Sequence, residues 1–365
     1  MKIRLNGRFG NLMFESIYKG KTVLVTGDTG FKGSWLAIWL MELGANVIGY
    51  AFAPKSRKDN YVICGLDKRI NHVNADIRDY QKLLRVFSKY KPSIAFHLAA
   101  QSLVIDSYKF PSRTYSTNVM GTVNFLEAVR NTPCVKVAIT VTSDKCYENR
   151  GCVYFYRESD PLGGKDPYSS SKAASEIITS SYIHSFFSHE GSANIASVRA
   201  GNVIGGGDWA DNRIFPDCMR ALLGNKPIAL RNPESMRPWQ HVLEPLGGYL
   251  ILANCLYQKG KKYSGAWNFG PERKSMVSVK ELVLQILKEW GSGSYICSKK
   301  TINRREENAL GLDISKAKRQ LKWKPVLSLA QAVKLVLEEY KIRGLTCAEV
   351  FGQRVRHIRK YVTLQ

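Results

Sequence analysis

The stretch TVLVTGDTGFKG, residues 22–33, joins an apolar, β-branched run to three glycines spaced three residues apart. Such a run predicts a buried strand. The apolar spacing that follows predicts a helix over residues 30–43. Gly27, Gly30 and Gly33 then lie where the strand turns into the helix, and small residues there let a phosphate approach the amide groups of the helix N-terminus. This unit predicts a sheet that binds a dinucleotide.

Further apolar runs alternate with helical spacing along the chain. The predicted strands cover residues 22–27, 46–52, 72–77, 93–100, 135–143 and 194–203, with WNFG at 267–270 as one more strand. Long helices are predicted over 113–130 and 167–187. Strands that alternate with helices imply a parallel sheet covered on both faces, and right-handed crossovers make it doubly wound. We therefore expect an α/β fold with a doubly wound parallel sheet of the Rossmann type.

The alternation ends after residue 203. Helical segments at 216–224, 278–290 and 328–341 are separated by short loops, which predicts a smaller, discontinuous domain at the carboxyl ends of the strands. The expected parts are an N-terminal extension (1–19), a dinucleotide-binding domain (20–203 and 241–272) and a substrate domain (204–240 and 273–365).

Composition narrows the class of protein. The chain has 365 residues, 44% hydrophobic and 23% charged, as is usual for a soluble globular protein. No apolar run is long enough to span a bilayer, so no membrane partner is expected. The opening MKIRLNGRFG has no apolar run typical of a secretory signal, although a short targeting leader stays open. Eight scattered cysteines without a CxxC pair predict free thiols in the cytoplasm and no metal site.

The net charge of +24 has two readings. A strongly basic protein attracts polyanions, including nucleic acid. The alternative is a lysine-rich surface around a site for a small anion. Basic residues are spread along the whole chain without a single stripe, for example KSRK at 55–58 and KAKR at 316–319. We therefore expect no nucleic-acid partner.

Polar side chains stand where the predicted strand over 135–143 ends. TSDKCY, residues 142–147, places Ser143, Asp144 and Lys145 side by side. A hydroxyl, a carboxylate and an ammonium at one strand tip form either a solvated turn or a set of groups for proton transfer.

Tyr168 and Lys172 lie four residues apart on the predicted helix over 167–187, and therefore on one face. A lysine ammonium beside a phenol favours the phenolate and lowers a pKa that is about 10 when unperturbed. A phenolate beside a nicotinamide can accept a hydroxyl proton while hydride leaves the carbon. YxxxK also occurs by chance, but here it follows a polar strand tip in a predicted dinucleotide-binding sheet.

The ends of the second and third strands bear on the choice of dinucleotide. YAFAP, residues 50–54, lacks the acidic residue that usually binds the ribose 2′-hydroxyl. Three basic residues follow it: Lys55, Arg57 and Lys58. Asp76, with Ile77, either places a carboxylate near the adenine or caps a helix over 79–89. These residues leave both NAD and NADP open.

Eight stretches together carry a family resemblance. They are, in order, TGDTGFKG, HLAAQ, STNVMGT, TSDKCY, DPYSSSK, RAGNVIGGGDW, RPWQHVLEPL and WNFGP. They resemble the extended short-chain dehydrogenase/reductase superfamily, and within it the nucleotide-sugar dehydratase branch that contains the CDP-glucose 4,6-dehydratases. The resemblance runs from about Tyr18 to beyond Gly344. That branch usually has histidine at the position of Asp28 and a histidine-bearing segment where this chain reads RREENAL (304–310).

The resemblance implies an NAD-dependent internal redox dehydration of a nucleotide sugar, with CDP-glucose as the expected substrate. Hydride leaves C4, a proton leaves C5, the C6 hydroxyl leaves as water, and hydride returns to C6. The implied catalytic residues are Ser143, Asp144, Lys145, Tyr168 and Lys172. Ser143 would bind the C4 oxygen beside Tyr168. Asp144 would protonate the leaving hydroxyl and Lys145 would remove the C5 proton.

The resemblance also implies two sets of binding residues. The cofactor set is Gly27, Thr29, Gly30, Phe31, Lys32, Gly33, Asp76, Ile77, Ala99, Ala100, Asn118, Tyr168 and Lys172. The substrate set is Gln101, Ser143, Asn202, Arg213, Arg237 and Arg305. Arg237 is expected to bind a pyrophosphate oxygen in bidentate fashion. Arg213 and Arg305 could equally be solvated surface residues, and Asn118 is expected to support the strands beside the site.

Other expectations follow from the same resemblance. The helices over 113–130 and 167–187 should pack against their copies in a homodimer or homotetramer. A role in dideoxyhexose biosynthesis for lipopolysaccharide O-antigen is implied. Two alternatives stay open: a dehydratase or epimerase of dTDP-, UDP- or GDP-linked sugars, and a catalytically silent dinucleotide-sensing or nucleic-acid-binding protein. An epimerase needs Tyr168 and Lys172 but not the pair Asp144 and Lys145.

Overall fold

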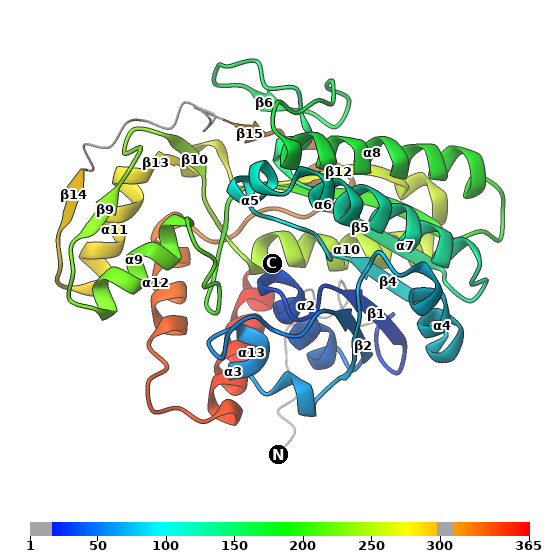
Figure 1. Cartoon of the computed structure of the whole chain (residues 1–365), viewed down its shortest axis with the longest axis horizontal. Coiled ribbons are helices and arrows are strands. Elements are labelled where there is room, and N and C mark those ends of the chain that lie inside the picture. The colour runs from blue at the N-terminus through cyan, green and yellow to red at the C-terminus, as the bar shows by residue number, and fades with distance from the viewer. Residues whose placement is uncertain (1–16, 298–309) are drawn as a thin grey trace.

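The predicted doubly wound sheet is confirmed. The computed structural model describes residues 17–297 and 310–365. Seven parallel strands lie in the order β12-β7-β5-β4-β1-β2-β3 (Figure 1). Their bounds are β1 Thr22–Thr26, β2 Asn46–Ala51, β3 Asn71–Asn74, β4 Ile94–His97, β5 Val137–Val141, β7 Asn194–Ala200 and β12 Gly265–Phe269. From β1 the chain first adds β2 and β3 on one side of the sheet and then β4, β5, β7 and β12 on the other. The strand order therefore reverses between β1 and β4, and doubly wound folds bind their ligands at such a point.

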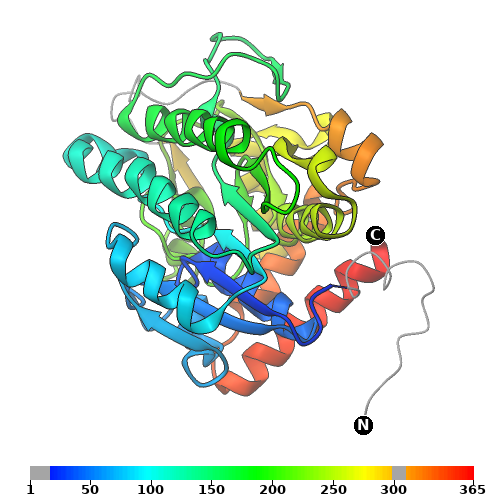
Figure 2. The ribbon, with the colours of Figure 1, turned by 90° about the vertical axis from the view of Figure 1, so that its right-hand side faces the viewer.

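Alternate residues of each strand enter two separate cores. In β1, Val23 and Val25 pack into one core and Leu24 into the other. The helices α2 (Phe31–Glu42) and α10 (Leu243–Lys259) cover the first face. The second face is covered by α4 (Tyr80–Tyr90), α7 (Gly121–Arg130) and α8 (Pro167–Phe186), and Figure 2 shows α7 and α8 side by side. Because both faces are buried at the centre of the sheet, the strands β1, β4 and β5 read as nearly continuous apolar runs.

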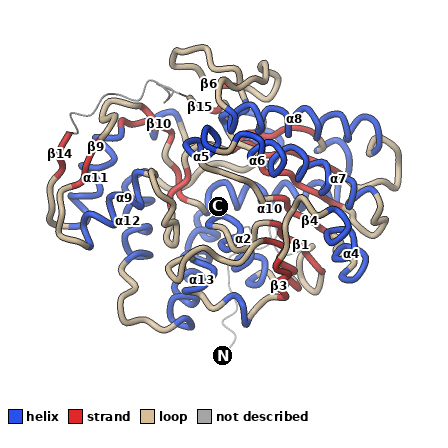
Figure 3. The backbone as a smooth tube through the Cα atoms, viewed as in Figure 1, coloured by secondary structure: helices blue, strands red, loops and turns tan. Residues whose placement is uncertain are grey.

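A smaller lobe lies beyond the carboxyl ends of the strands, on the left of Figures 1 and 3. Its helices are α9 (Ile214–Leu223), α11 (Val279–Trp290) and α12 (Leu329–Tyr340), packed around a core that includes Phe215 and Leu282. Its strand pairs are β9 (Ile228–Leu230) with β14 (Tyr295–Cys297), and β10 (Met236–Pro238) with β13 (Met276–Ser278). These three-residue pairings are too short to leave a periodic signal in the sequence.

The predicted helix over 113–130 is divided into three pieces. It consists of α6 (Pro111–Tyr115), a π-helical turn η2 (Ser116–Met120) and α7. A π-turn inside a helix frequently marks a functional site. Other short elements are α3 (Asn60–Ile63), η1 (Leu66–Lys68), α5 (Val104–Lys109), η3 (Asp144–Cys146), β6 (Phe155–Tyr156), β8 (Val203–Ile204), β11 (Gln240–His241), η4 (Gly260–Tyr263), η5 (Arg273–Ser275), β15 (Gly311–Leu312) and η6 (Ala317–Leu321).

The last helix, α13 (Cys347–Leu364), lies against α2 of the sheet domain. The Tyr361 ring meets the Trp39 ring edge-on, with centroids 5.6 Å apart. The end of the chain thus covers the helix that follows the glycine-rich turn, while the domain boundaries given above stay a prediction. Among the described residues, no helix is long and apolar enough to cross a membrane.

Candidate active site

The glycine-rich turn closes tightly between β1 and α2. Gly27 has φ of +77°, and a Cβ atom there would lie 2.7 Å from the backbone nitrogen of Ala99. A Cβ atom at Gly33 would lie 2.0 Å from the Gly27 carbonyl oxygen. Gly30 precedes the first residue of α2, and no side chain of the described part of the chain caps that end. The N-terminal amide groups of α2 are therefore open to a phosphate, and cofactor binding by these residues stays a prediction.

Asp28 points away from the predicted phosphate position. Its carboxylate is fully buried beneath the turn, and Oδ2 lies 2.8 Å from Nδ1 of His72 in β3. Gly49 in β2 leaves the space that this carboxylate fills, because a Cβ atom there would lie 2.1 Å from Oδ2. Burial raises the pKa of Asp28, and the hydrogen bond from His72 opposes that change. The Asp28 side chain, at the position where the resembled branch usually has histidine, is thus held inside the sheet domain by His72 and the space at Gly49.

The helix that follows β3 is capped by a residue other than the one considered in the sequence. Asp79 caps α4 by accepting a hydrogen bond from the Lys82 amide at 2.9 Å. Asp76 instead binds its neighbour Arg78, with 2.9 Å between Arg78 Nε and Asp76 Oδ2. The helix-cap reading of Asp76 is therefore wrong, and the reading near the adenine stays a prediction. Ile77 is buried next to Gly121 of α7.

Asn118 joins the end of β4 to α8 from its place in the π-turn. Its Oδ1 accepts from the Gln101 amide at 2.8 Å, and its Nδ2 donates to the Gln101 carbonyl at 3.0 Å. The same Nδ2 donates to Ser171 Oγ at 2.9 Å. The segment of Ala99, Ala100 and Gln101 is thereby held between the glycine-rich turn and the helix that carries Tyr168 and Lys172. These contacts reach the end of β4, whereas the expected support of the fifth strand by Asn118 stays a prediction.

The three polar residues at the strand tip form a compact turn directly after β5. Ser143 Oγ donates to Asp144 Oδ1 at 2.9 Å, and the Lys145 amide donates back to Ser143 Oγ at 3.3 Å. Ser143 and Asp144 are buried, whereas Lys145 is half-buried. Gly201, after β7, lies against the Asp144 carboxylate, because a Cβ atom there would lie 2.8 Å from Oδ2. A solvated turn does not fit this burial.

Tyr168 and Lys172, in the first two turns of α8, lie near the carboxyl end of β5. Asp166 caps this helix, accepting from the Tyr168 amide at 3.0 Å. Lys172 Nζ donates to the Val141 carbonyl at the end of β5, 3.1 Å away. Burial lowers the pKa of Lys172 to about 8, opposed by the charge of Glu176. The aspartate immediately before Pro167 was the signal in the sequence for this cap, and its role was missed.

The expected lowering of the Tyr168 pKa does not occur in the protein alone. Burial raises the pKa of Tyr168 to about 12, and the hydrogen bond with Ser143 only partly opposes this. The prediction from the sequence was wrong on this point because it weighed the nearby ammonium and left out desolvation. The Lys172 ammonium donates a hydrogen bond to the Val141 carbonyl and keeps its charge near the end of β5.

Two further basic residues belong to the same electrostatic neighbourhood. Burial lowers the pKa of Lys32, in the first turn of α2, to about 8, with Arg213 and Lys172 adding to the change and Asp144 opposing it. Arg213 lies at the start of α9 and forms an ion pair with Asp208 at 2.8 Å. Lys32 and Arg213 thus gather positive charge beside the turn at residues 143–146, whose catalytic role stays a prediction. Positive charge there suits an anionic ligand.

Three further predicted substrate residues are Asn202, Arg237 and Arg305, and the first two have backbone contacts in the structure. Asn202 follows β7, and its carbonyl accepts from the Gln240 amide at 3.1 Å. Arg237 lies in β10 of the smaller lobe, and its Nη1 donates to the Met236 carbonyl at 2.8 Å. Arg305 lies outside the described residues. Their contacts with a substrate stay predictions.

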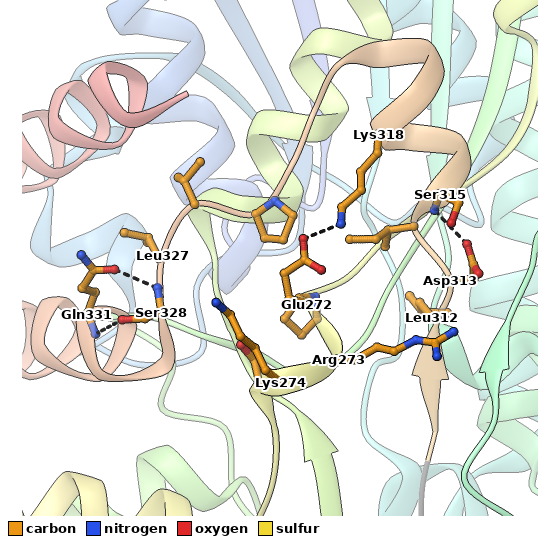
Figure 4. A pocket seen from close by; sticks show the side chains of 15 residues that line it. Glu272, Arg273, Lys274, Leu312, Asp313, Ser315, Lys318, Leu327, Ser328 and Gln331 are labelled. Atoms are coloured by element: carbon orange, nitrogen blue, oxygen red, sulfur yellow. Dashed lines mark hydrogen bonds and ion pairs between the residues drawn. The ribbon is translucent and has the colours of Figure 1, made fainter.

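A separate hollow of about 610 Å³ lies between the loop after β12 and the start of α12. Figure 4 shows Glu272 and Lys318 pointing toward each other there, joined by an ion pair at 2.5 Å. Arg273, Asp313 and Gln331 line the same hollow. None of the predicted catalytic residues lines it, so it is distinct from the candidate active site.

Known proteins resemble this chain along most of its length. The family described as GDP-mannose 4,6 dehydratase matches residues 24–336. The chain is 45% identical over 336 residues to a CDP-glucose 4,6-dehydratase of Salmonella typhimurium, which covers 90% of this chain and 94% of that protein. A CDP-paratose 2-epimerase of Salmonella typhi is 26% identical and covers 85% of this chain and 96% of that protein.

Solved structures share the fold. A dTDP-glucose 4,6-dehydratase of Bacillus anthracis in complex with NAD superimposes with a TM-score of 0.73 at 22% identity, covering 89% of this chain and 98% of that one. A UDP-glucose 4-epimerase of Thermotoga maritima with UDP-glucose gives a TM-score of 0.73 at 23% identity, covering 88% of this chain and 98% of that one. From its glycine-rich turn to its carboxyl lobe, the chain belongs to the GDP-mannose 4,6 dehydratase family of extended short-chain dehydrogenases/reductases.

Proposed function

We propose that this protein is an NAD-dependent hydro-lyase that converts CDP-glucose to CDP-4-keto-6-deoxyglucose and water. The observation that carries this proposal is the meeting of two groups of residues at one sheet edge. Ser143, Asp144 and Lys145 follow β5, while Tyr168 and Lys172 come from α8. The 45% identity to a CDP-glucose 4,6-dehydratase supports CDP-glucose as the substrate.

The residues of the glycine-rich turn fit a dinucleotide. The open N-terminus of α2 suits its pyrophosphate, and the bend at Gly27 leaves room for close approach. When bound, NAD supplies an acceptor for the hydride of C4 and returns that hydride to C6. Structures of related dehydratases and epimerases in complex with NAD support NAD as the cofactor.

Each side chain then has a separate task in proton transfer. Ser143 and Tyr168 hold the C4 oxygen, and Tyr168 accepts its proton. Because burial raises the pKa of Tyr168 to about 12, the positive charges of Lys172 and the bound cofactor are needed to favour the phenolate. Lys145, the more exposed member of the turn, removes the C5 proton and returns a proton to C5 when the hydride reaches C6. Asp144, held by Ser143, protonates the leaving C6 hydroxyl.

The pyrophosphate of the substrate meets positive charge from both lobes. Lys32 and Arg213 lie beside the catalytic turn, and Arg237 comes from β10. Arginine binds phosphate oxygens through two parallel hydrogen bonds, so Arg237 is assigned to the pyrophosphate. Gln101 and Asn202 complete the sugar side of the pocket in this proposal.

A second copy of the chain is the proposed partner. Side chains that are apolar and at least half exposed lie on α5 to α8 at Phe110 (54%), Met120 (51%) and Ile177 (57%). Exposed apolar residues gathered on neighbouring helices are typical of an interface. The two-fold packing of such helices expected from the family supports a homodimer, or a homotetramer built from it. The eight free cysteines support a reducing compartment such as the cytoplasm.

The proposed function is tested by turnover with catalytic NAD⁺. The protein is incubated separately with CDP-glucose, dTDP-glucose, UDP-N-acetylglucosamine and GDP-mannose, and products are identified by mass and NMR. A 4-keto-6-deoxy sugar should form from CDP-glucose in large excess over NAD⁺, with no net NADH. Build-up of NADH in proportion to product would show a plain dehydrogenase. Faster product formation from one of the other nucleotide sugars would show that this sugar, and not CDP-glucose, is the preferred substrate.

A further inference from the structure

A buried ion pair lies beneath the catalytic turn. Glu176 Oε2 and Arg199 Nη2 are 2.7 Å apart, and each side chain is only 2–3% exposed. Glu176 lies one helical turn after Lys172 in α8, and Arg199 lies in β7. A buried ion pair stabilises a fold no better than a well-packed apolar pair, so its value is sought in the geometry that it fixes.

Glu176 holds the beginning of the turn. It accepts a hydrogen bond from the hydroxyl of Thr142, the residue directly before Ser143. Its other oxygen accepts from Ser197 Oγ of β7 at 2.7 Å. Lys172 of α8 binds the Val141 carbonyl, and Glu176, one helical turn later, binds the Thr142 hydroxyl. Two successive residues at the end of β5 are therefore hydrogen-bonded to two successive turns of α8.

Arg199 holds the end of the turn. Its Nη1 donates to the Tyr147 hydroxyl at 2.6 Å, and its guanidinium carbon lies 4.7 Å from the centre of the Tyr147 ring. The Tyr147 hydroxyl donates in turn to Asn268 Oδ1 of β12 at 2.8 Å. Tyr147 directly follows η3, which contains Asp144 and Lys145.

We propose that the Glu176–Arg199 pair is a positioning device that fixes both ends of the 143–146 turn, at Thr142 and at Tyr147, and so aims Asp144 and Lys145 at the substrate. This inference rests on the proposed function for its catalytic consequence. Neither member of the pair contacts the reacting atoms in it. Groups aimed in this way lose rate steeply when displaced, with about a hundredfold loss for a shift of about 1 Å.

Two conservative variants release one end each. Thr142→Val removes the hydroxyl that reaches Glu176, and Tyr147→Phe removes the hydroxyl that reaches Arg199. In the NAD-loaded protein we expect each to lower kcat for CDP-glucose by about tenfold to a hundredfold, with KM changed by less than about threefold. Thr142→Ser keeps the hydroxyl and should restore kcat. Solvent deuterium entry at C5 should slow more than hydride removal from C4, because Tyr168 and Lys172 keep their own supports.

Matched controls lie close by. Thr140→Val makes the same change two residues earlier in β5, where the hydroxyl meets Thr179 instead of Glu176. Tyr156→Phe makes the same change in the ring stacked on Tyr147, whose hydroxyl accepts from the Arg150 amide. Both controls should keep kcat within about twofold of the parent protein if the effect belongs to the ion pair.

Hydrogen–deuterium exchange separates this inference from the proposed function. Thr142→Val and Tyr147→Phe should speed amide exchange in a peptide covering 142–149 and leave exchange in the N-terminal half of α8 unchanged. Faster exchange without turnover of any nucleotide sugar by the parent protein would refute the proposed function alone. Unchanged exchange together with unchanged kcat would overturn the positioning device. Parallel losses of kcat, KM and α8 protection would also overturn it, by showing a merely structural role.

Discussion

Asp28 Oδ2 lies 2.8 Å from His72 Nδ1, and this contact ties the glycine-rich turn to the far strand β3. The aspartate carboxylate is fully buried, and its second oxygen, Oδ1, has no partner among the described residues. The pair joins residues 44 positions apart in the chain. It holds in place the turn that is expected to receive the dinucleotide.

Replacing His72 should therefore destabilise the protein. His72→Leu leaves the Asp28 carboxylate buried without its side-chain hydrogen-bond donor, at a cost of about 1–3 kcal/mol in the free energy of unfolding. Urea denaturation at neutral pH measures this cost. Glu42→Gln is the control, because it breaks the exposed ion pair with Arg359 and should cost less than about 1 kcal/mol. Equal effects of the two variants would contradict the importance of the buried contact.

Glu244 gives the folded protein a specific pH dependence. It lies buried in α10 and accepts hydrogen bonds from the Val326 and Leu327 amides and from the Tyr361 hydroxyl. Burial raises the pKa of Glu244 to about 7 from an ordinary value of 4.5. Because the folded state holds this proton more tightly, the group's contribution to stability is greatest below about pH 4.5 and is lost as the pH rises to about 7.

Other buried groups also make stability depend on pH, for example His97, whose pKa burial lowers to about 3. The difference in unfolding free energy between the parent protein and Glu244→Gln gives the contribution of Glu244 alone. The parent protein should lose on the order of 2–3 kcal/mol relative to the variant between pH 5 and pH 8. Urea titrations at several pH values give the difference directly. Two free-energy curves that run parallel across this range would show that Glu244 ionises normally.

The apolar face on α5 to α8 predicts the oligomeric state. Met120→Glu and Ile177→Glu place a charge where a second copy is expected to pack, and each should convert the oligomer to monomers at micromolar concentration. Light scattering after size-exclusion chromatography measures the mass. Leu223→Glu is the control, since Leu223 is 55% exposed on α9 in the other lobe. A parent protein that is already monomeric would refute the interface.

The long elements were predictable because their apolar periods are regular. The predicted bounds of β1, β2 and α8 agree with the structure to within a few residues. Tyr168 and Lys172 lie four residues apart on one helix, so their spacing alone places them on one face.

Contacts between distant elements could not be read in the same way. Glu176 and Arg199 meet only because of how far α8 is shifted along β7, and no local pattern encodes that shift. The same holds for Asp28 and His72. The pKa of Tyr168 was misjudged for a related reason, because the depth of burial depends on the whole fold.

The sharpest prediction concerns the separate roles proposed for Lys145 and Asp144. Lys145→Ala should still remove hydride from C4, because Ser143, Tyr168 and Lys172 remain. It should then stop with transient NADH and no solvent deuterium at C5. Asp144→Asn should allow both hydride removal and exchange at C5 but should lose water slowly. Each loss should be about a hundredfold to ten-thousandfold, as is typical of positioned proton transfer.

Rapid mixing with CDP-glucose in deuterated solvent resolves these steps, with NADH followed by absorbance and C5 exchange followed by NMR. The Lys165→Ala variant is a suitable control, since that lysine is exposed just before the start of α8 and should behave like the parent protein. The different burial of the two side chains, half-buried for Lys145 and buried for Asp144, is consistent with two separate roles. Deuterium entering C5 at the parent rate in Lys145→Ala would assign the base to another residue and leave Asp144 as the acid.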